Sequence, residues 1–222
     1  MNIVEPGKGL YGRLPEGHEI LMEIATGLIP EYAGVRWQNR MAEHVRETGA
    51  KVIVETGVQS GVSSDRILRV LEETGGMLYS CDPHPLYQTF DTYGKHPNWR
   101  TEKRFSLDAL PIFFMEAGEF DIFIHDSDHE VETQTFEYEA AWGLVKPGGW
   151  ILSDDWTWAQ HNAWTKFCGR HALYSFERGS CVYAQKPLTE PEVPHTAEYL
   201  ESVMAAAYEL SQMATDKPAY FR

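Results

Sequence analysis

Cysteine is scarce in this chain of 222 residues. Only Cys81, Cys168 and Cys181 are present, and no two of them have the CxxC spacing of zinc and redox sites. Their odd number and spacing favour reduced core residues of an intracellular protein over a disulfide or zinc framework. Basic residues are also few, since 19 Lys and Arg face 33 Asp and Glu, a formal net charge of −14. This balance argues against duplex nucleic acid and anionic membranes as partners, because both present negative charge.

Long apolar runs are absent as well. None approaches the ~20 residues that span a bilayer. The N-terminal segment MNIVEPGKGLYGRLPEG lacks the basic region followed by an apolar stretch that marks a secretory signal. We therefore expect a soluble cytoplasmic protein. The length and the hydrophobic content of 43% suit one compact domain with some appended elements.

From Lys51 onward, short apolar runs alternate with helix-length segments, which predicts an α/β fold with a mostly parallel sheet and helices on both faces. The predicted strands are Val52–Glu55, Leu78–Cys81, Arg104–Phe105, Asp121–His125 and Trp150–Ser153. The predicted helices are His18–Leu28, Arg36–Thr48, Ser63–Glu73, Leu107–Met115, Val131–Leu144 and Ala159–Cys168. The segment ALYSFERGSCVYAQK then predicts a β-hairpin, which completes seven strands with an antiparallel last one.

Two further regions flank this predicted domain of residues 50–186. Residues 1–49 form an arm followed by helices. After Lys186, a stiff linker with Pro187, Pro191 and Pro194 leads to a predicted helix, Ala197–Met213, in the region 187–222. That helix carries an apolar stripe at Leu200, Val203, Met204, Ala207 and Leu210.

The segment from Phe120 to Asp155 carries most of the functional information. Two apolar runs each end in a pair of carboxylates, and one helix-length segment separates them. A right-handed strand–helix–strand connection returns the second strand parallel to the first, so both acidic pairs should emerge at the same sheet edge. The pairs are Asp126 with Asp128 and Asp154 with Asp155. Four carboxylates in a small space call for a cation or protons between them, so the segment predicts a ligand site and favours a metal.

A turn with two glycines follows the first predicted strand. The run from Glu55 to Gly61 has the spacing ExGxxxG, which matches neither the GxGxxG of dinucleotide sites nor the GxxxxGK[ST] of phosphate loops. Such glycines let the backbone approach a ligand at the start of the next helix, and a tight turn without any ligand is the alternative. Asp82, at the end of the second strand, stands where an acceptor for ribose hydroxyls is expected and favours the ligand.

Taken in order, the motifs ETGVQSG, LYSCD, RFSLDALP, FIHDSDH and VKPGGWILSDD resemble the class I S-adenosylmethionine-dependent methyltransferases. Within that class the chain is similar to the metal-assisted O-methyltransferases, the group of the catechol, caffeoyl-CoA and macrolide-sugar enzymes. The resemblance covers about residues 50–186 and implies a Rossmann-like sheet. One departure is the polar Ser80 in the strand before Asp82, where many relatives have a longer apolar run.

The resemblance also implies which residues bind S-adenosylmethionine. Asp126 would face both the cofactor and the reacting groups. The other expected contacts are Glu55, Gly57, Gly61 and Ser63 at the methionine end, Asp82 at the ribose, and Ser106 and Leu107 beside the adenine.

By the same resemblance, Asp126, Asp154 and Asp155 would bind a divalent metal. Carboxylate oxygens suit Mg²⁺, which lowers the pKa of an acceptor hydroxyl and fixes its position. Asp155 stands where the family can have Asn, so it keeps the oxygen and adds a charge. His129, three residues after Asp126, occupies the position of the family's lysine or histidine base, which takes the hydroxyl proton.

Read without the resemblance, these side chains have plainer interpretations. Asp154 and Asp155 are then solvated acids at a strand end, and His129 begins a helix and faces solvent. Asp128 is interpreted as a helix cap rather than a metal ligand. His125, inside the apolar run, is interpreted as a core histidine.

The residues that bind the acceptor are the least defined. Trp156 and Trp158 either pack their loop onto the core or form an apolar wall for a ring substrate, and we expect one of them to touch the acceptor. The N-terminal segment with Tyr11, Trp37 and Arg40 is where this fold often carries a lid over the acceptor.

The sequence thus predicts an enzyme that transfers a methyl group from S-adenosylmethionine to a hydroxyl of a small molecule, with Mg²⁺ and with His129 as base. One alternative is a metal-independent methyltransferase, and another is a non-catalytic module that binds the cofactor and a partner. A nicotinamide oxidoreductase is disfavoured by the glycine spacing. We expect no nucleic-acid or membrane partner, and we favour a homodimer because metal-assisted relatives often associate.

Overall fold

The computed structural model describes residues 35–86, 90, 95–154, 161–178, 181–189 and 197–213. The predicted helix His18–Leu28 and most of the predicted arm and linker lie outside these residues. So do Tyr11, Asp155, Trp156 and Trp158, which the sequence had assigned to the lid, the metal site and the acceptor wall.

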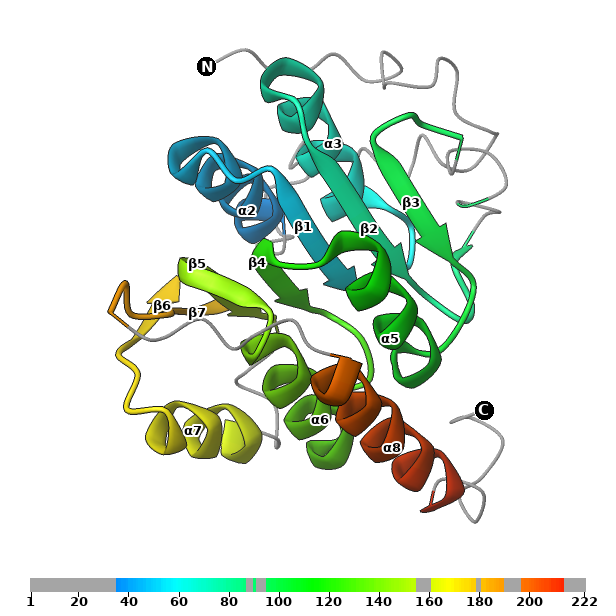
Figure 1. Cartoon of the computed structure of the whole chain (residues 1–222). Coiled ribbons are helices and arrows are strands. Elements are labelled where there is room, and N and C mark those ends of the chain that lie inside the picture. Colours follow the sequence, from blue (N-terminus) through cyan, green and yellow to red (C-terminus); the bar gives the residue numbers. More distant parts are fainter. Residues whose placement is uncertain are drawn as a thin grey trace.

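A seven-stranded sheet forms the centre of the described structure (Figure 1). Its order is β3-β2-β1-β4-β5-β7-β6, and β7 runs antiparallel to both of its neighbours while the pairs from β3 to β5 are parallel. The predicted Rossmann-like fold with an antiparallel last strand is therefore confirmed. The strands are β1 Val52–Thr56, β2 Met77–Cys81, β3 Trp99–Glu102, β4 Phe120–His125, β5 Val145–Ser153, β6 Ser175–Arg178 and β7 Cys181–Gln185.

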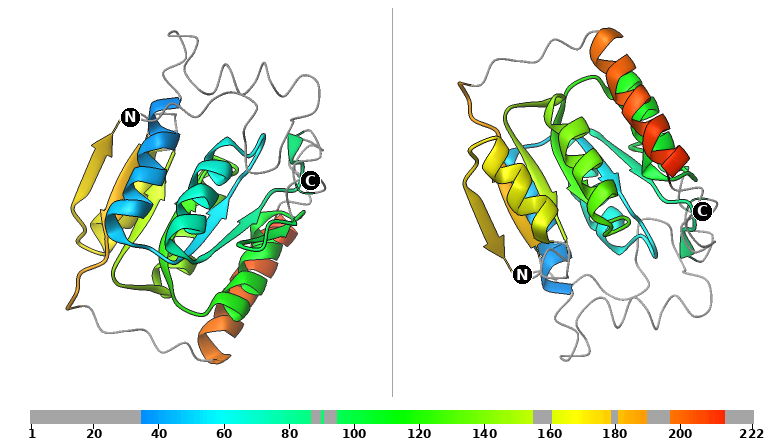
Figure 2. Two further views of the ribbon diagram at one scale, coloured as in Figure 1. Left: turned by 90° about the horizontal axis from the view of Figure 1, so that it is seen from above. Right: turned by 90° about the horizontal axis from the view of Figure 1, so that it is seen from below.

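Helices cover both faces of the sheet and enclose two apolar cores (Figure 2). On one face lie α2 Val35–Thr48 and α3 Val62–Thr74. The other face carries α5 Ser106–Ala117, α6 Val131–Trp142, α7 His161–Arg170 and α8 Ala197–Met213. These bounds agree with the predicted helices to within two residues at nearly every end. Among the described residues, no helix has the length and apolar character needed to cross a membrane.

The third strand was predicted in the wrong place. The structure has β3 at Trp99–Glu102 rather than at Arg104–Phe105, and Phe105 instead caps the start of α5. β3 is an edge strand that pairs only with β2, so Trp99 is its one buried residue and the strand shows no apolar run. The hydrophobic pattern of the sequence therefore does not predict this strand.

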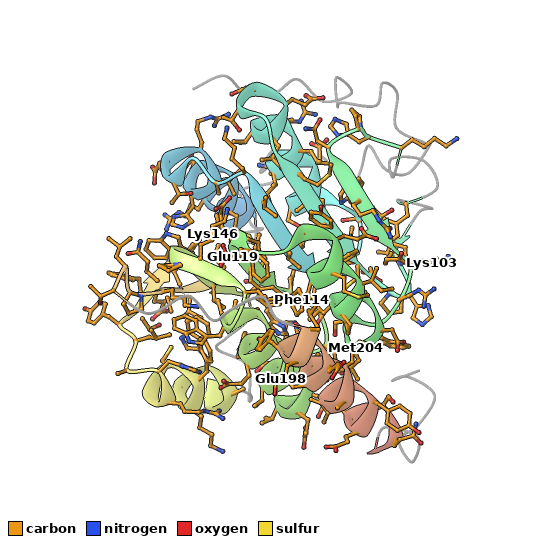
Figure 3. The ribbon with its side chains drawn as sticks, in the orientation of Figure 1. Lys103, Phe114, Glu119, Lys146, Glu198 and Met204 are labelled. Carbon is orange, nitrogen blue, oxygen red and sulfur yellow. The ribbon has the colours of Figure 1, made fainter. Side chains whose placement is uncertain are left out.

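Helix α8 packs against α5 and α6 of its own chain. Its anchor is Tyr199, whose hydroxyl donates to the carbonyl of Ala140 at 2.6 Å and whose burial raises the pKa of the phenol to about 12. A Cβ on Gly143 would overlap the Tyr199 ring, so the glycine leaves room for the tyrosine. Of the predicted apolar stripe, Val203 and Ala207 are buried and Leu200 and Leu210 are partly buried against the core. Met204 is 49% exposed on α8 (Figure 3).

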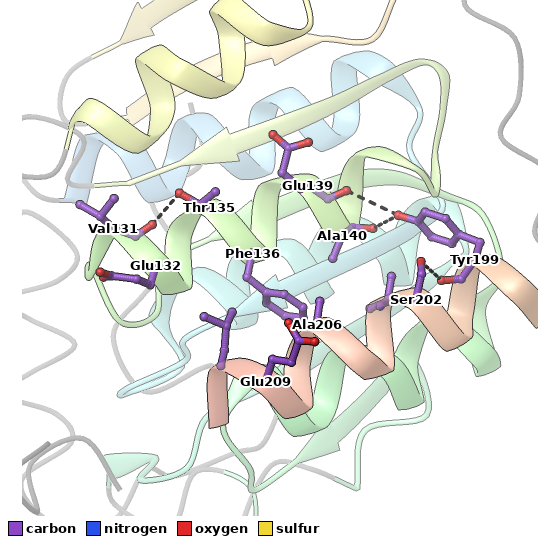
Figure 4. A pocket seen from close by; sticks show the side chains of 12 residues that line it. Val131, Glu132, Thr135, Phe136, Glu139, Ala140, Tyr199, Ser202, Ala206 and Glu209 are labelled. Atoms are coloured by element: carbon purple, nitrogen blue, oxygen red, sulfur yellow. Dashed lines mark hydrogen bonds between the residues drawn. The ribbon is translucent and has the colours of Figure 1, made fainter. Parts of the chain in front are cut away.

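Beside this anchor, a groove of about 550 Å³ runs between α6 and α8 (Figure 4). Its lining is largely apolar and includes Val131, Phe136, Ala140, Val203 and Leu210. Three of these residues, Phe136, Ala140 and Val203, also belong to the core, so the groove borders the packing of α8 on α6.

We expect Gly143→Ala to destabilise the protein by about 1–3 kcal/mol, because the added methyl group displaces the Tyr199 ring. Gly169→Ala in α7 is the matched control, since no atom lies within 4 Å of its added Cβ. That substitution should stabilise the protein by about 0.5–1 kcal/mol through its helix propensity. Urea unfolding measures both changes, and equal effects would show that α8 does not dock as described.

Candidate active site

The carboxyl end of β1 lies between the ends of β2 and β4. The N–H of Gly57 donates to the carbonyl of Cys81 at 2.8 Å, and the N–H of Asp126 donates to the carbonyl of Thr56 at 2.8 Å. Gly57 has a φ of +82°, and a Cβ at this position would overlap the carbonyl oxygen of Asp126. The glycine is thus required by the contact between the two predicted motifs, and the sequence alone had attributed it to the approach of a ligand.

Glu55 supports the glycine loop from beneath. Its carboxylate is fully buried and accepts hydrogen bonds from the hydroxyls of Ser63, Ser64 and Ser80 at 2.6–2.8 Å. Burial raises the pKa of Glu55, and the three hydroxyls oppose that change. Ser80 also accepts from the indole of Trp99 at 2.8 Å. The polar residue that departs from the family pattern in β2 is therefore a partner of Glu55 and of β3.

Asp82 lies beside the same loop at the end of β2. One carboxylate oxygen accepts from the N–H groups of Val58 at 3.0 Å and Gln59 at 2.7 Å, and the other accepts from His84 N–H at 2.7 Å. Gln59 has a φ of +50°, a conformation that non-glycine residues rarely adopt. Asp82 thus holds the loop in a strained shape at the edge where ligands of α/β sheets bind.

Asp126 and Asp154 emerge side by side, as predicted from the parallel strands. His125 is opposite Ser153 in the register of β4 and β5, and the N–H of Asp154 donates to the His125 carbonyl at 3.0 Å. Asp154 is only 5% exposed. The pKa of the Cys181 thiol is raised well above its usual value, first by burial and then by the charges of Asp154 and Asp126. Both carboxylates therefore lie within electrostatic reach of one buried thiol.

The third predicted metal ligand, Asp155, falls outside the described residues. In the ranges that the structure does describe, no group of three or more His, Cys, Asp and Glu side chains is arranged to hold a metal ion. The structure therefore describes only two of the three predicted metal ligands. The two members that are described, Asp126 and Asp154, offer the oxygen donors that a hard divalent cation prefers.

The remaining polar residues of the acidic segment have separate roles. Asp128 accepts from the N–H of Glu130 at 3.0 Å and from the hydroxyl of Thr133 at 3.2 Å, so it braces the start of α6. The N-cap residue of α6 is Glu130 and not Asp128, and no side chain makes a capping hydrogen bond there. His125 is fully buried, which confirms its interpretation as a core histidine. The ring of His129 lies 5.5 Å from the His125 ring, centroid to centroid, in an edge-on contact.

Comparison with known proteins agrees with this arrangement. Residues 54–156 match the family described as a methyltransferase domain. The matched segment is just under half of the chain and is similar to a methyltransferase domain. Its sequence is 26% identical over 171 residues to the methyltransferase str2 of Strobilurus tenacellus, an alignment that covers 73% of this chain and 54% of that protein. The chain thus spans about half the length of this curated relative.

Solved structures of methyltransferases share the fold of this chain. An O-methyltransferase from Bacillus cereus in complex with SAH superposes with a TM-score of 0.60 at 18% identity, covering 76% of this chain and 90% of that one. The MycE methyltransferase of the mycinamycin pathway, in complex with Mg and SAH, superposes with a TM-score of 0.53 at 18% identity, covering 70% and 51%.

Two neighbouring residues of α6 were not predicted from the sequence as part of the site. Glu137 is fully buried and bonds to His125, Thr56 and Ser127, and the hydroxyl of Tyr138 lies 2.6 Å from that of Ser153. Only His125 indicated in the sequence that a buried polar residue lies nearby, because a buried imidazole inside an apolar strand requires a polar partner. The identity of that partner was not encoded by any local pattern.

Two of the predicted cofactor contacts lie at the start of helix α5. Ser106 is its first residue and its hydroxyl bonds to Glu137, while Leu107 is partly buried against the core. Trp164, which follows Trp156 and Trp158 in the sequence, is buried in the core and donates to the Ser175 hydroxyl at 2.9 Å. Arg40, predicted near the lid, lies exposed on α2.

We expect Gly57→Ala to destabilise the protein by about 2–5 kcal/mol, because it combines left-handed strain with overlap of the Asp126 carbonyl. Gly49→Ala is the matched control, since Gly49 also has a positive φ of +68° but no atom lies within 4 Å of its added Cβ. That variant should lose only about 1–2 kcal/mol. Urea unfolding compares the two, and similar losses would mean that the contact with Asp126 is not restrictive.

Proposed function

We propose that this protein is an S-adenosylmethionine-dependent O-methyltransferase that acts on a hydroxyl group of a small molecule with the assistance of a divalent metal. The contact between Gly57 and Asp126 is the observation that carries the proposal. It joins the glycine loop, where the cofactor is expected, to the acidic edge, where the metal is expected. A methyl donor and an activated acceptor must meet in one such space, within about 3–3.5 Å and in line.

The residues around the loop fit the proposed cofactor. Gly57 and Gly61 both have positive φ and shape a tight turn, and Asp82 provides a carboxylate at the strand end for the ribose hydroxyls. Glu55 and Ser63 bond to each other under this turn, so their contribution is to hold its shape. Ser106 and Leu107 open α5 at the same edge and would border the adenine. The SAH bound in the Bacillus cereus neighbour supports this choice of cofactor.

The acidic edge fits a divalent metal. Asp126 and Asp154 present neighbouring carboxylates, and Asp155 would complete the set. Bound there, Mg²⁺ would lower the pKa of the acceptor hydroxyl and fix its position. The Mg held by the MycE neighbour supports this choice.

His129 is the proposed general base. It follows Asp126 by three residues and would accept the proton of the acceptor hydroxyl as the oxygen attacks the methyl carbon. The bond from sulfur to that carbon breaks as the bond to oxygen forms, which leaves S-adenosylhomocysteine and a methyl ether. Trp156 and Trp158 would form the apolar wall that holds the acceptor, and residues 1–49 would cover it.

Calorimetric titration should show that the protein binds S-adenosylmethionine and S-adenosylhomocysteine. We expect Asp82→Ala to weaken binding about 10–100-fold, because charge-assisted hydrogen bonds contribute about 1.5–3 kcal/mol each. Asp108→Ala is a control on an exposed acid in the first turn of α5 and should bind like the wild type. Absence of binding to either compound by the wild type would refute the proposed function.

Methyl transfer from labelled S-adenosylmethionine to a panel of catechols and sugars tests the metal and the base. EDTA and Asp154→Asn should both abolish transfer, and added Mg²⁺ should reverse only the effect of EDTA. We expect His129→Ala to lower kcat about 10²–10⁴-fold. Asp128→Ala is the matched control and should keep activity, because that side chain braces α6. Transfer that resists both EDTA and Asp154→Asn would instead support a metal-independent enzyme.

A further inference from the structure

The buried carboxylate of Glu137 makes hydrogen bonds to several segments that form the proposed site. Glu137 of α6 accepts from Thr56 at 2.7 Å, from Nδ1 of His125 at 2.6 Å and from Ser127 at 2.7 Å. The hydroxyl of Ser106 also bonds to it. These four donors come from the end of β1, the end of β4, the loop after β4 and the start of α5.

The donors keep this carboxylate charged although it is buried. Burial alone would raise the pKa of Glu137. The facing His125 and the hydroxyls lower the pKa by more than burial raises it, so the pKa of Glu137 lies below the usual value of 4.5. An ionised carboxylate has only acceptor sites, about four in number, so each of the four donors finds one. Because a buried charge is tolerated only when it is fully hydrogen-bonded, the four segments are held in one arrangement.

Two of the residues held by Glu137 in turn hold the two acids of the site. The carbonyl of Thr56 accepts the N–H of Asp126, and the carbonyl of His125 accepts the N–H of Asp154. The side chains of these same two residues bond to Glu137. Glu137 is thus linked to each acid through one intervening residue, Thr56 or His125.

We propose that Glu137, together with His125, is the positioning pair that sets the spacing between the glycine loop, Asp126 and Asp154. This inference rests on the proposed function, since it concerns the same site. Glu137 does not touch the reacting groups and acts through Thr56, His125 and Ser127. A second carboxylate serves as a natural comparison. Asp121, at the opposite edge of the sheet, accepts from the N–H groups of Lys51 and Val52 and from the Lys146 ammonium.

The two carboxylates tie the same strands at opposite edges, so Glu137→Gln and Asp121→Asn form a matched pair. Each variant keeps the size of its side chain and removes the charge. Calorimetry would measure the dissociation constants of S-adenosylhomocysteine and, in its presence, of Mg²⁺. Amide hydrogen exchange would measure the protection of the N–H groups of Asp126 and Asp154 without any ligand.

We expect Glu137→Gln to raise both dissociation constants about tenfold, as loss of an outer-shell partner does at metal sites. The protection of Asp126 and Asp154 should fall about tenfold as well. Asp121→Asn should lower the melting temperature but leave both dissociation constants within about twofold, because it is remote from the site. Wild-type binding and protection in Glu137→Gln, or equal losses in both variants, would overturn the inference.

Two further outcomes remain decisive. If Glu137→Gln does not fold, Ser127→Ala removes one of the four donors and should weaken S-adenosylhomocysteine binding and amide protection about threefold. Values equal to those of the wild type would then overturn the inference. If the wild type binds neither ligand, the proposed function fails, and the exchange measurement still decides whether Glu137 holds the acidic edge.

Discussion

The rest of the site depends on the close contact at the carboxyl end of β1. The N–H of Gly57 donates to the carbonyl of Cys81 in β2, and the N–H of Asp126, which follows β4, donates to the carbonyl of Thr56. The space between Gly57 and the Asp126 carbonyl has no room for a Cβ. This contact brings the backbone of the glycine loop directly against the backbone of the acidic edge. Reacting groups bound by the two motifs would therefore be held close together, which is the main requirement of a transfer reaction.

Glu55 and Glu137 stabilise this end of the sheet, and Asp121 stabilises the opposite end. Each of the three carboxylates is compensated in its own way. Glu55 is surrounded by hydroxyls, so burial dominates and its pKa is raised. Glu137 also faces the imidazole of His125, and its pKa is lowered. Asp121 accepts two backbone N–H groups and the Lys146 ammonium, and its pKa is lowered despite partial burial. The sign of each shift therefore follows from whether a basic group is among the donors.

The sequence predicted those parts of the fold whose signal is local. The apolar runs of β1, β2 and β4, the end of β5 and the hairpin of β6 and β7 were all recognised, because central strands must be apolar along their length. The edge strand β3 was missed because only Trp99 needs to be buried. Ser80 was noted as a departure from the family pattern, and only its contacts with Glu55 and Trp99 explain why a hydroxyl is there.

The amino-acid sequence by itself determined that Asp126 and Asp154 meet at one sheet edge, since strand polarity and right-handed connection allow no other arrangement. Only the tertiary structure decided which acids of α6 turn inward. Glu137 and Glu139 are two residues apart in the same helix, yet Glu137 is buried among donors while Glu139 pairs with Arg170 and His171 near the surface. The donors that make the burial of Glu137 possible come from β1, β4 and α5. No local pattern contains them, because they are brought together only when the chain is folded.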